Sequence, residues 1–224
     1  TSMYQTPPEH FLRLHFPRSR FSRRFEDTLL LLANKIIEMG MMDKESFDTL
    51  LDKTIAETTS EPLTEKTIHN QRTEMIRLFG LAKYVENLAV PGNRLALLTQ
   101  TQDIPRFFKS FCNRFQFPGG FVKPDRVSEM VKAGVKLKPA PYILRLLIIG
   151  NQKHGDFAIS AAEVTHFLFN DTRITVQKEE PNIPLARIKE ARENGIELDR
   201  TSDIIRYARD FLNYMVEANL LTEF

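Results

Sequence analysis

The chain has 224 residues, of which 42% are hydrophobic and 27% charged, so it can form one large domain or two small ones with a proper core. Its net charge of +2 favours no particular partner, and a single cysteine, Cys112, excludes a disulfide framework within the chain. No apolar run approaches the roughly 20 residues of a membrane-spanning helix, which is typical of a globular, cytoplasmic protein. Cys112 lies among phenylalanines at helical spacing and is expected to be a core residue.

Residues 1–24 are expected to form a basic N-terminal arm. Between Phe11 and Phe25 there are five arginines and no acidic residue. Such a segment is either a solvated terminus or an arm that lies along DNA phosphates or enters a groove, as homeodomain arms do. The phenylalanines between the arginines favour an arm that packs on the body of the protein. The DNA contacts expected here are Arg18, Arg20, Arg23 and Arg24.

Residues 25–120 are dominated by helical periodicity. Asp43 and Thr64 can cap helices at their amino ends, and Gly40 and Gly80 can end them. The helices expected in this part are 25–39, 43–55, 64–78 and 99–115.

A β-hairpin is predicted directly after the third of these helices. Residues 83–90 and 94–98 alternate in polarity around Pro91-Gly92-Asn93, which can supply the turn. A reading helix followed by a hairpin is the core of a winged helix. Residues 25–120 are therefore predicted to form a first winged-helix (helix-turn-helix) subdomain with a small β-wing.

The polar face of the helix 64–78 carries the side-chain types that read base edges in the major groove. Asn and Gln can bridge adenine, Arg can fork onto guanine, and Glu can accept a hydrogen bond from cytosine. Any solvated surface helix also has a polar face, but the hairpin behind this one favours DNA reading. The contacts expected on this helix and at the hairpin tip are Lys66, His69, Asn70, Gln71, Arg72, Thr73, Glu74, Arg77 and Arg94.

The second half is predicted to contain a linker helix within residues 121–138 and a second winged-helix subdomain over residues 139–224. Residues 220–224 are expected to begin a strand whose return partner is missing, so that the second wing is truncated. The chain would then be part of something longer. The helices expected in the second subdomain are 142–149, 160–169, 184–193 and 201–219.

The last of these helices repeats the reading pattern, with polar side chains opposite a wide apolar stripe. At its amino end, free backbone N–H groups and the helix dipole favour a phosphate. A solvated amphipathic helix is the alternative interpretation. The DNA contacts expected here are Arg200, Ser202, Arg206, Tyr207 and Arg209.

No catalytic site is predicted. A PD-(D/E)xK nuclease needs two carboxylates and a lysine that converge on Mg²⁺, but Asp125 is followed by Val135-Lys-Leu-Lys138 with no acid in the required place. The five histidines are scattered, and His166 in an apolar helix is expected to be a core or boundary residue. One cysteine cannot make a zinc site, and no glycine-rich phosphate loop is present.

Several sequence blocks resemble the amino-terminal recognition domain of the restriction endonuclease BpuJI, and the overall layout is similar to the DNA-recognition part of FokI. The similarity extends from about residue 25 to residue 224. The blocks are Glu65–Glu74, Leu78–Gly80, Phe111–Gly120, Pro141–Leu144, Leu212–Met215 and Ala218–Leu220.

The resemblance implies a mainly α fold with two winged-helix subdomains that clasp a short asymmetric DNA sequence, while a separate carboxy-terminal domain cuts. It implies base contacts by Asn70, Gln71, Arg72 and Glu74 in the first subdomain and by Arg206, Tyr207 and Arg209 in the second.

The expected function is sequence-specific binding of double-stranded DNA, as the target-recognition module of a type II restriction endonuclease. The chain is expected to act as a monomer, with no small-molecule substrate or membrane partner and no cofactor of its own. Mg²⁺ is expected only for a nuclease domain outside this chain. The alternatives are a winged-helix scaffold that binds protein and a transcriptional repressor, which is usually dimeric with a palindromic site.

Overall fold

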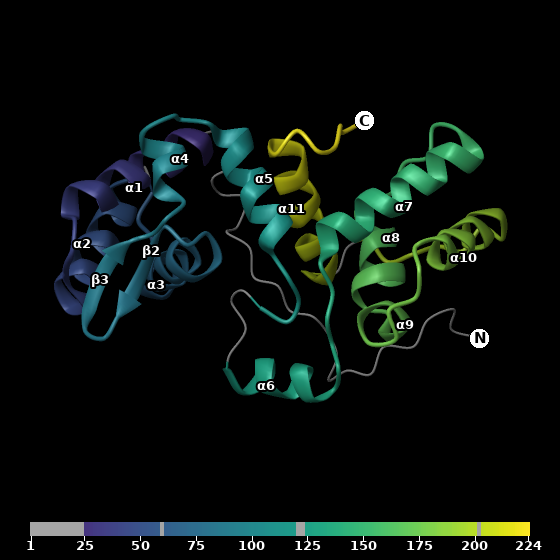
Figure 1. Cartoon of the computed structure of the whole chain (residues 1–224), viewed down its shortest axis with the longest axis horizontal. Coiled ribbons are helices and arrows are strands. Elements are labelled where there is room, and N and C mark those ends of the chain that lie inside the picture. The colour runs from purple at the N-terminus through teal and green to yellow at the C-terminus, as the bar shows by residue number, and fades with distance from the viewer. Residues whose placement is uncertain (1–24, 59–60, 120–123, 201–202) are drawn as a thin grey trace. The chain divides into compact units, whose positions relative to one another are not determined.

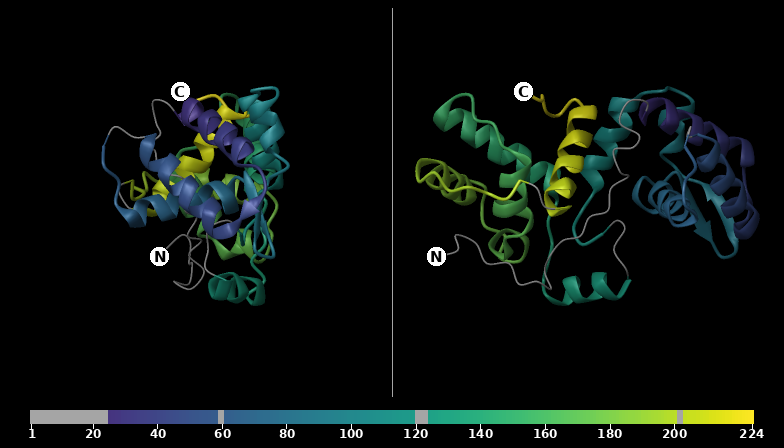
Figure 2. Two further views of the ribbon diagram at one scale, coloured as in Figure 1. Left: turned by 90° about the vertical axis from the view of Figure 1, so that its left-hand side faces the viewer. Right: turned by 180° about the vertical axis from the view of Figure 1, so that it is seen from behind.

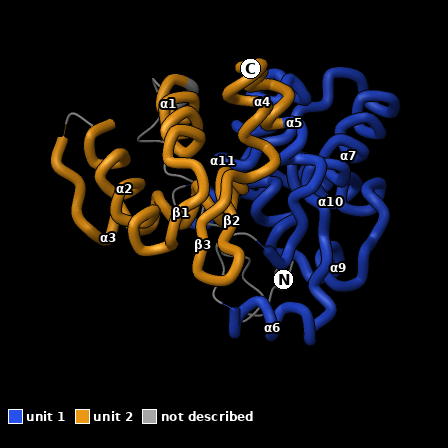
Figure 3. Tube along the Cα trace, turned by 60° about the vertical axis from the view of Figure 1, so that its left-hand side comes forward, with its two compact units in different colours: residues 1–14, 109–224 blue, residues 15–108 orange. Residues whose placement is uncertain are grey.

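The computed structural model describes residues 25–58, 61–119, 124–200 and 203–224 (Figure 1). Within this part the chain is mainly α-helical, with one small antiparallel sheet. It forms two compact units, and their described residues are 25–108 in unit 2 and 109–224 in unit 1 (Figure 3). The basic arm with Arg18, Arg20, Arg23 and Arg24 lies outside the described residues, and so does Ser202.

In unit 2, helices α1 to α3 gather around a hairpin (Figure 1). A π-helical turn, η3, continues α3 without a break. The helices are α1 (Phe25–Met39), α2 (Lys44–Glu57), α3 (Glu65–Thr73), η3 (Glu74–Leu78), α4 (Leu95–Thr99) and α5 (Ile104–Arg114). The strands are β1 (Met42–Asp43), β2 (Ala82–Val85) and β3 (Leu88–Pro91).

The helix starts in unit 2 follow local capping chemistry. The Asp43 carboxylate accepts from the backbone N–H of Ser46 at 2.9 Å, and the Thr64 hydroxyl accepts from that of Thr67 at 3.3 Å. Each cap satisfies a donor that the first turn of a helix leaves without an internal partner. The predicted caps of the second and third helices are confirmed.

The sheet has the order β1-β3-β2, with both pairs antiparallel. Ala82 pairs with Pro91 and Val85 with Leu88, so the hairpin turns at residues 86–87. The prediction of a turn at 91–93 is wrong, and residues 95–99 are helical.

Gly92 is required by close approach, because a Cβ there would lie 2.0 Å from the carbonyl oxygen of Gly80. Its backbone N–H donates to the Leu81 carbonyl at 2.8 Å, which ties the end of β3 to the chain that precedes β2. The glycine that suggested a turn therefore serves tertiary packing.

An aromatic cluster forms part of the core of unit 2. Phe79, Phe107 and Phe108 are fully buried, and their ring centroids lie 5.3–6.1 Å apart in edge-on or tilted contacts. Such ring pairs add to the free energy gained from burial. The cluster joins the end of η3 to α5, and so supports the helix that carries the predicted DNA contacts.

Among the described residues of unit 1, the regular elements are helices and an isolated bridge between Phe117 and Leu137. Helices α7 and α10 lie side by side, seen in green and yellow-green in Figure 2. The helices are α6 (Pro124–Lys132), α7 (Pro139–His154), α8 (Ala161–Glu163), the π-helical turn η4 (Val164–Phe169), α9 (Thr172–Thr175), α10 (Asn182–Glu193) and α11 (Asp203–Glu217).

A strand was predicted at residues 220–224, but the chain after α11 has no regular secondary structure, so this prediction is wrong. The predicted capping box is confirmed: the Ser160 hydroxyl accepts from the Glu163 N–H, and the Glu163 carboxylate accepts from the Ser160 N–H. Arg192 of α10 donates to that carboxylate at 2.7 Å, which fastens α10 to the start of α8.

The core of unit 1 contains a chain of aromatic rings with centroids 5.3–6.2 Å apart. The rings are those of Phe111, Phe115, Phe117, Phe169, Phe211 and Tyr214. Because these rings bring residues 111–117 onto the later helices, the division between the units falls within α5, after Phe108. The sequence places the end of the first subdomain later, at residue 120.

Cys112 also lies in the core of unit 1. Its side chain is fully buried, as predicted, and burial raises the pKa of the thiol to about 12.

Candidate nucleic-acid interface

Helix α3 presents a polar face to solvent. Lys66, His69, Asn70 and Arg77 are exposed, while Thr73 is half-buried and donates its hydroxyl hydrogen to the His69 carbonyl at 2.8 Å. Lys66, Asn70 and Thr73 follow one another at helical spacing, so one stripe of the helix carries a cation, an amide and a hydroxyl. These groups can contact both phosphates and base edges.

Gln71 and Glu74 do not belong to this exposed face, and the expectation of a solvent-facing position for them is wrong. Both are buried, with 6% of each residue exposed. Gln71 lies four residues before the core residue Met75, and Glu74 lies four residues before the core residue Leu78, on the inward side of the helix. The Gln71 side-chain oxygen has no hydrogen-bond partner in the described part of the chain.

Arg72 is held against α2 by two carboxylates. Its guanidinium lies 2.6 Å from the Asp52 carboxylate and 3.9 Å from that of Asp48, and all three side chains are about one-fifth exposed. Tyr84 of β2 donates a short hydrogen bond to Asp48. These contacts join α2 to both α3 and β2, and Arg72 would have to leave its carboxylates to read a base.

The Asp52 carboxyl is partly buried among the groups of this network. Burial raises its pKa, although the positive charge of Arg72 and the neighbouring His69 act in the opposite direction. His69 lies 3.4 Å from the same carboxylate, and the second oxygen of Asp52 is buried without a hydrogen-bond partner in the described structure. Arg72 is therefore the cation that compensates the charge of Asp52.

Arg94 was predicted to lie at the tip of the hairpin. This prediction is wrong, because the turn lies at residues 86–87. Arg94 precedes α4, is half-buried, and donates to the carbonyl of Phe79 at 3.3 Å. Its guanidinium thus satisfies the backbone at the end of η3.

In unit 1, α11 is mainly a core helix. Asp210 and Tyr214 are buried together with the apolar stripe of this helix. Arg209 is exposed, Arg206 and Tyr207 are half-buried, and the Arg206 guanidinium lies 5.5 Å from the centre of the Tyr207 ring.

Asp210 directly follows Arg209 in the sequence and lies four residues after Arg206. Burial raises the pKa of its carboxyl to about 6, against the opposing effect of Arg206 and Arg209. Arg200 is exposed in the segment before α11. Helix α11 therefore exposes fewer candidate contact residues than α3 does.

The partners of Arg72 were missed by the sequence interpretation. Asp48 and Asp52 are four residues apart on α2, a spacing that places both on one face of a helix. The spacing could have indicated a pair of carboxylates on one face of α2, but only the tertiary structure shows that Arg72 is the cation they bind.

The described residues contain no group of three or more His, Cys, Asp or Glu side chains that could hold a metal ion. His166 is half-buried, and its ring nitrogen lies 3.2 Å from the Asp199 carbonyl oxygen, as expected for a boundary residue. Across the same residues, no helix combines the length and apolar character needed to span a bilayer.

Comparison with known proteins gives one family and one solved structure. The family described as "Restriction endonuclease BpuJI - N terminal" matches residues 4–224. The structure is the crystal structure of pyrene- and phenanthrene-modified DNA in complex with the BpuJ1 endonuclease binding domain. It matches with a TM-score of 0.84 and 28% sequence identity over 98% of this chain and 81% of that chain. No curated protein matches the chain.

Proposed function

The chain belongs to the family of the amino-terminal domain of the restriction endonuclease BpuJI, and we propose that it binds double-stranded DNA in a sequence-specific manner, as the target-recognition module of a type II restriction endonuclease. The observation that carries the proposal is the match over 98% of the chain to a binding domain whose structure contains DNA.

The order of elements in unit 2 supports this proposal. Helix α1, strand β1, helices α2 and α3 and the β2–β3 hairpin follow one another, and β1 completes the sheet beside β3. This is the order of a winged helix, in which the helix before the hairpin enters the major groove. We assign that role to α3.

Within α3, we propose a division of roles according to exposure and pairing. Asn70 and Arg77, which are exposed, read base edges, and Lys66 contacts either bases or phosphate. Arg72, paired with Asp52 at 2.6 Å, instead fixes the position of α3 on α2. The arm arginines Arg20 and Arg24 contact phosphates and contribute affinity without sequence preference.

The chain itself is proposed to break no bonds. Cleavage would belong to a nuclease domain elsewhere in a parent endonuclease, with Mg²⁺ bound there. Because the two units differ in structure, the bound site would be asymmetric and one copy of the chain would be enough to bind it.

Selection of bound duplexes from a random library, followed by sequencing, tests the proposal. We expect the wild-type chain to enrich one short, non-palindromic motif, and Asn70→Ala to lose about 1–3 kcal/mol of discrimination at one base pair of that motif. Replacement of Arg20 and Arg24 by alanine should weaken binding to all duplexes alike. A palindromic motif would favour a repressor, and failure to bind any duplex at low salt would contradict the proposal.

A further inference from the structure

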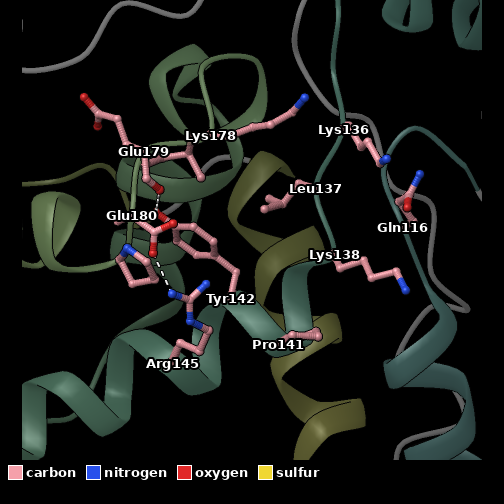
Figure 4. Close-up of a pocket in the computed structure, with 12 residues that line it drawn as sticks. Gln116, Lys136, Leu137, Lys138, Pro141, Tyr142, Arg145, Lys178, Glu179 and Glu180 are labelled. Atoms are coloured by element: carbon pink, nitrogen blue, oxygen red, sulfur yellow. Dashed lines mark hydrogen bonds and ion pairs between the residues drawn. The ribbon is translucent and has the colours of Figure 1, made fainter.

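Unit 1 contains a pocket of about 520 Å³, which is lined by residues between Gln116 and Pro181 (Figure 4). Lys136 and Lys138 line it from the segment before α7, and Lys178 lines it from the loop after α9. Leu137 between the first two points inward and is buried, whereas all three lysines are exposed. The lysine cluster (Lys136, Lys138 and Lys178) thus brings two separate segments to one rim.

The backbone under the lysine cluster is held by hydrogen bonds. Leu137 and Phe117 exchange backbone hydrogen bonds of 2.7 and 3.1 Å, and the Lys136 N–H donates to the Thr175 carbonyl at 2.8 Å. The segment with Lys136 and Lys138 is therefore tied to Thr175 at the end of α9, three residues before Lys178. The charges are carried on an ordered scaffold.

The other charges around the pocket are paired with each other. Arg145 lies 2.5 Å from the Glu180 carboxylate, and Arg187 lies 2.5 Å from that of Glu179. The side chains of the lysine cluster have no ion-pair or hydrogen-bond partner among the described residues. The pocket rim therefore carries three positive charges that the fold does not neutralise.

We propose that the lysine cluster contacts the phosphodiester backbone of the duplex that the chain binds, an inference that rests on the proposed function. A lysine is a point charge on a flexible stem, which suits attraction to phosphate and not the fixed bidentate reading of a base. Contact with a phosphate releases condensed counterions, so each such lysine adds to affinity and to its salt dependence but not to specificity.

The test measures the dissociation constant of the full 224-residue chain for duplex DNA over a series of salt concentrations. The pocket variant is Lys136→Ala/Lys178→Ala. The matched control is Lys153→Ala/Lys189→Ala, in the same unit and with the same loss of charge. Lys153 lies in the last turn of α7, about 22 Å along the helix from Lys138, and Lys189 binds His154 beside it at 2.9 Å.

We expect the slope of log affinity against log salt to become shallower by about 2 in the pocket variant, because each phosphate contact contributes about 0.9. Binding should weaken by the same factor for every duplex sequence, and Lys136→Arg/Lys178→Arg should keep the wild-type slope. An unchanged slope in the pocket variant, or an equal change in the control, would overturn this inference while leaving DNA binding intact. Failure of the wild-type chain to bind duplex would instead overturn the proposed function.

Discussion

The two units differ in whether their candidate DNA-binding cations are paired with carboxylates of the fold. In unit 2, Arg72 lies on the candidate reading helix but is paired with Asp48 and Asp52. In unit 1, the lysine cluster lies on loops outside the candidate helix α11, and its charges are unpaired within the described structure. The comparison teaches that the type of a residue and its place on a helix do not decide its role. Neutralisation within the fold decides which cations remain available to a polyanion.

The units also differ in how much of the candidate helix they expose. Helix α3 has few buried side chains before the π-helical turn, whereas only Arg209 and Asn213 are exposed among residues 204–217 of α11. Sequence-specific contacts are therefore expected mainly from unit 2, and unit 1 is expected to contribute more to affinity than to base choice. The following three predictions test this contrast, from the largest expected effect to the smallest.

The largest effects are expected in the two aromatic cores. Phe79→Ala in unit 2 and Phe211→Ala in unit 1 should each lower the free energy of unfolding by about 3–5 kcal/mol, because both rings are fully buried. Urea denaturation measures this, and Phe224→Ala, at a fully exposed position, serves as the control. A loss below about 1 kcal/mol in either unit would mean that its cluster is not a packed core.

A smaller effect, confined to unit 1, is expected from Asp210. Its pKa is raised to about 6, above the unfolded value near 4, so the folded protein gains stability as pH falls through 6 towards 4. At pH 7.5 the ionised carboxylate opposes folding, and Asp210→Asn should raise the free energy of unfolding by about 2–3 kcal/mol. Urea denaturation at pH 4.5 and 7.5 checks this. The exposed Asp125→Asn should change neither value, and a difference between Asp210→Asn and the wild type that is the same at both pH values would contradict the prediction.

The smallest effects separate Arg72 from Asn70 on α3. Arg72→Ala should lower the free energy of unfolding by about 1–3 kcal/mol, because it leaves two partly buried carboxylates without their cation. Asn70→Ala should change it by less than about 0.5 kcal/mol, because Asn70 is exposed. A double-mutant cycle of Arg72→Ala with Asp52→Ala measures their coupling. Equal stability losses in the two single variants would contradict the proposed positioning role of Arg72.

Local features of the fold were predictable because they depend on neighbouring residues. The helix over residues 25–39 and the caps at Asp43, Thr64 and Ser160 agree with the structure. The hairpin turn was misplaced because Pro91-Gly92-Asn93 has turn composition. Gly92 is in fact required by the backbone of Gly80, a contact between segments that no local pattern records.

The candidate site was predictable only in part, for the same reason. Helical spacing located the exposed residues Lys66, Asn70 and Arg77. The π-helical turn that changes the helical register after residue 73, the burial of Gln71 and Glu74 and the pairing of Arg72 depend on tertiary contacts. The lysine cluster was missed because its members belong to two loops about 40 residues apart in sequence.

The buried Cys112 has a practical consequence. It is the single cysteine of the chain, and with its pKa raised to about 12 almost none of it is thiolate near neutral pH. A maleimide dye will therefore react with a cysteine introduced at a surface position and leave Cys112 unmodified. Fluorophores can be attached to α3 or to the loop after α9 in the otherwise native chain, and each site can be followed separately as a ligand is titrated.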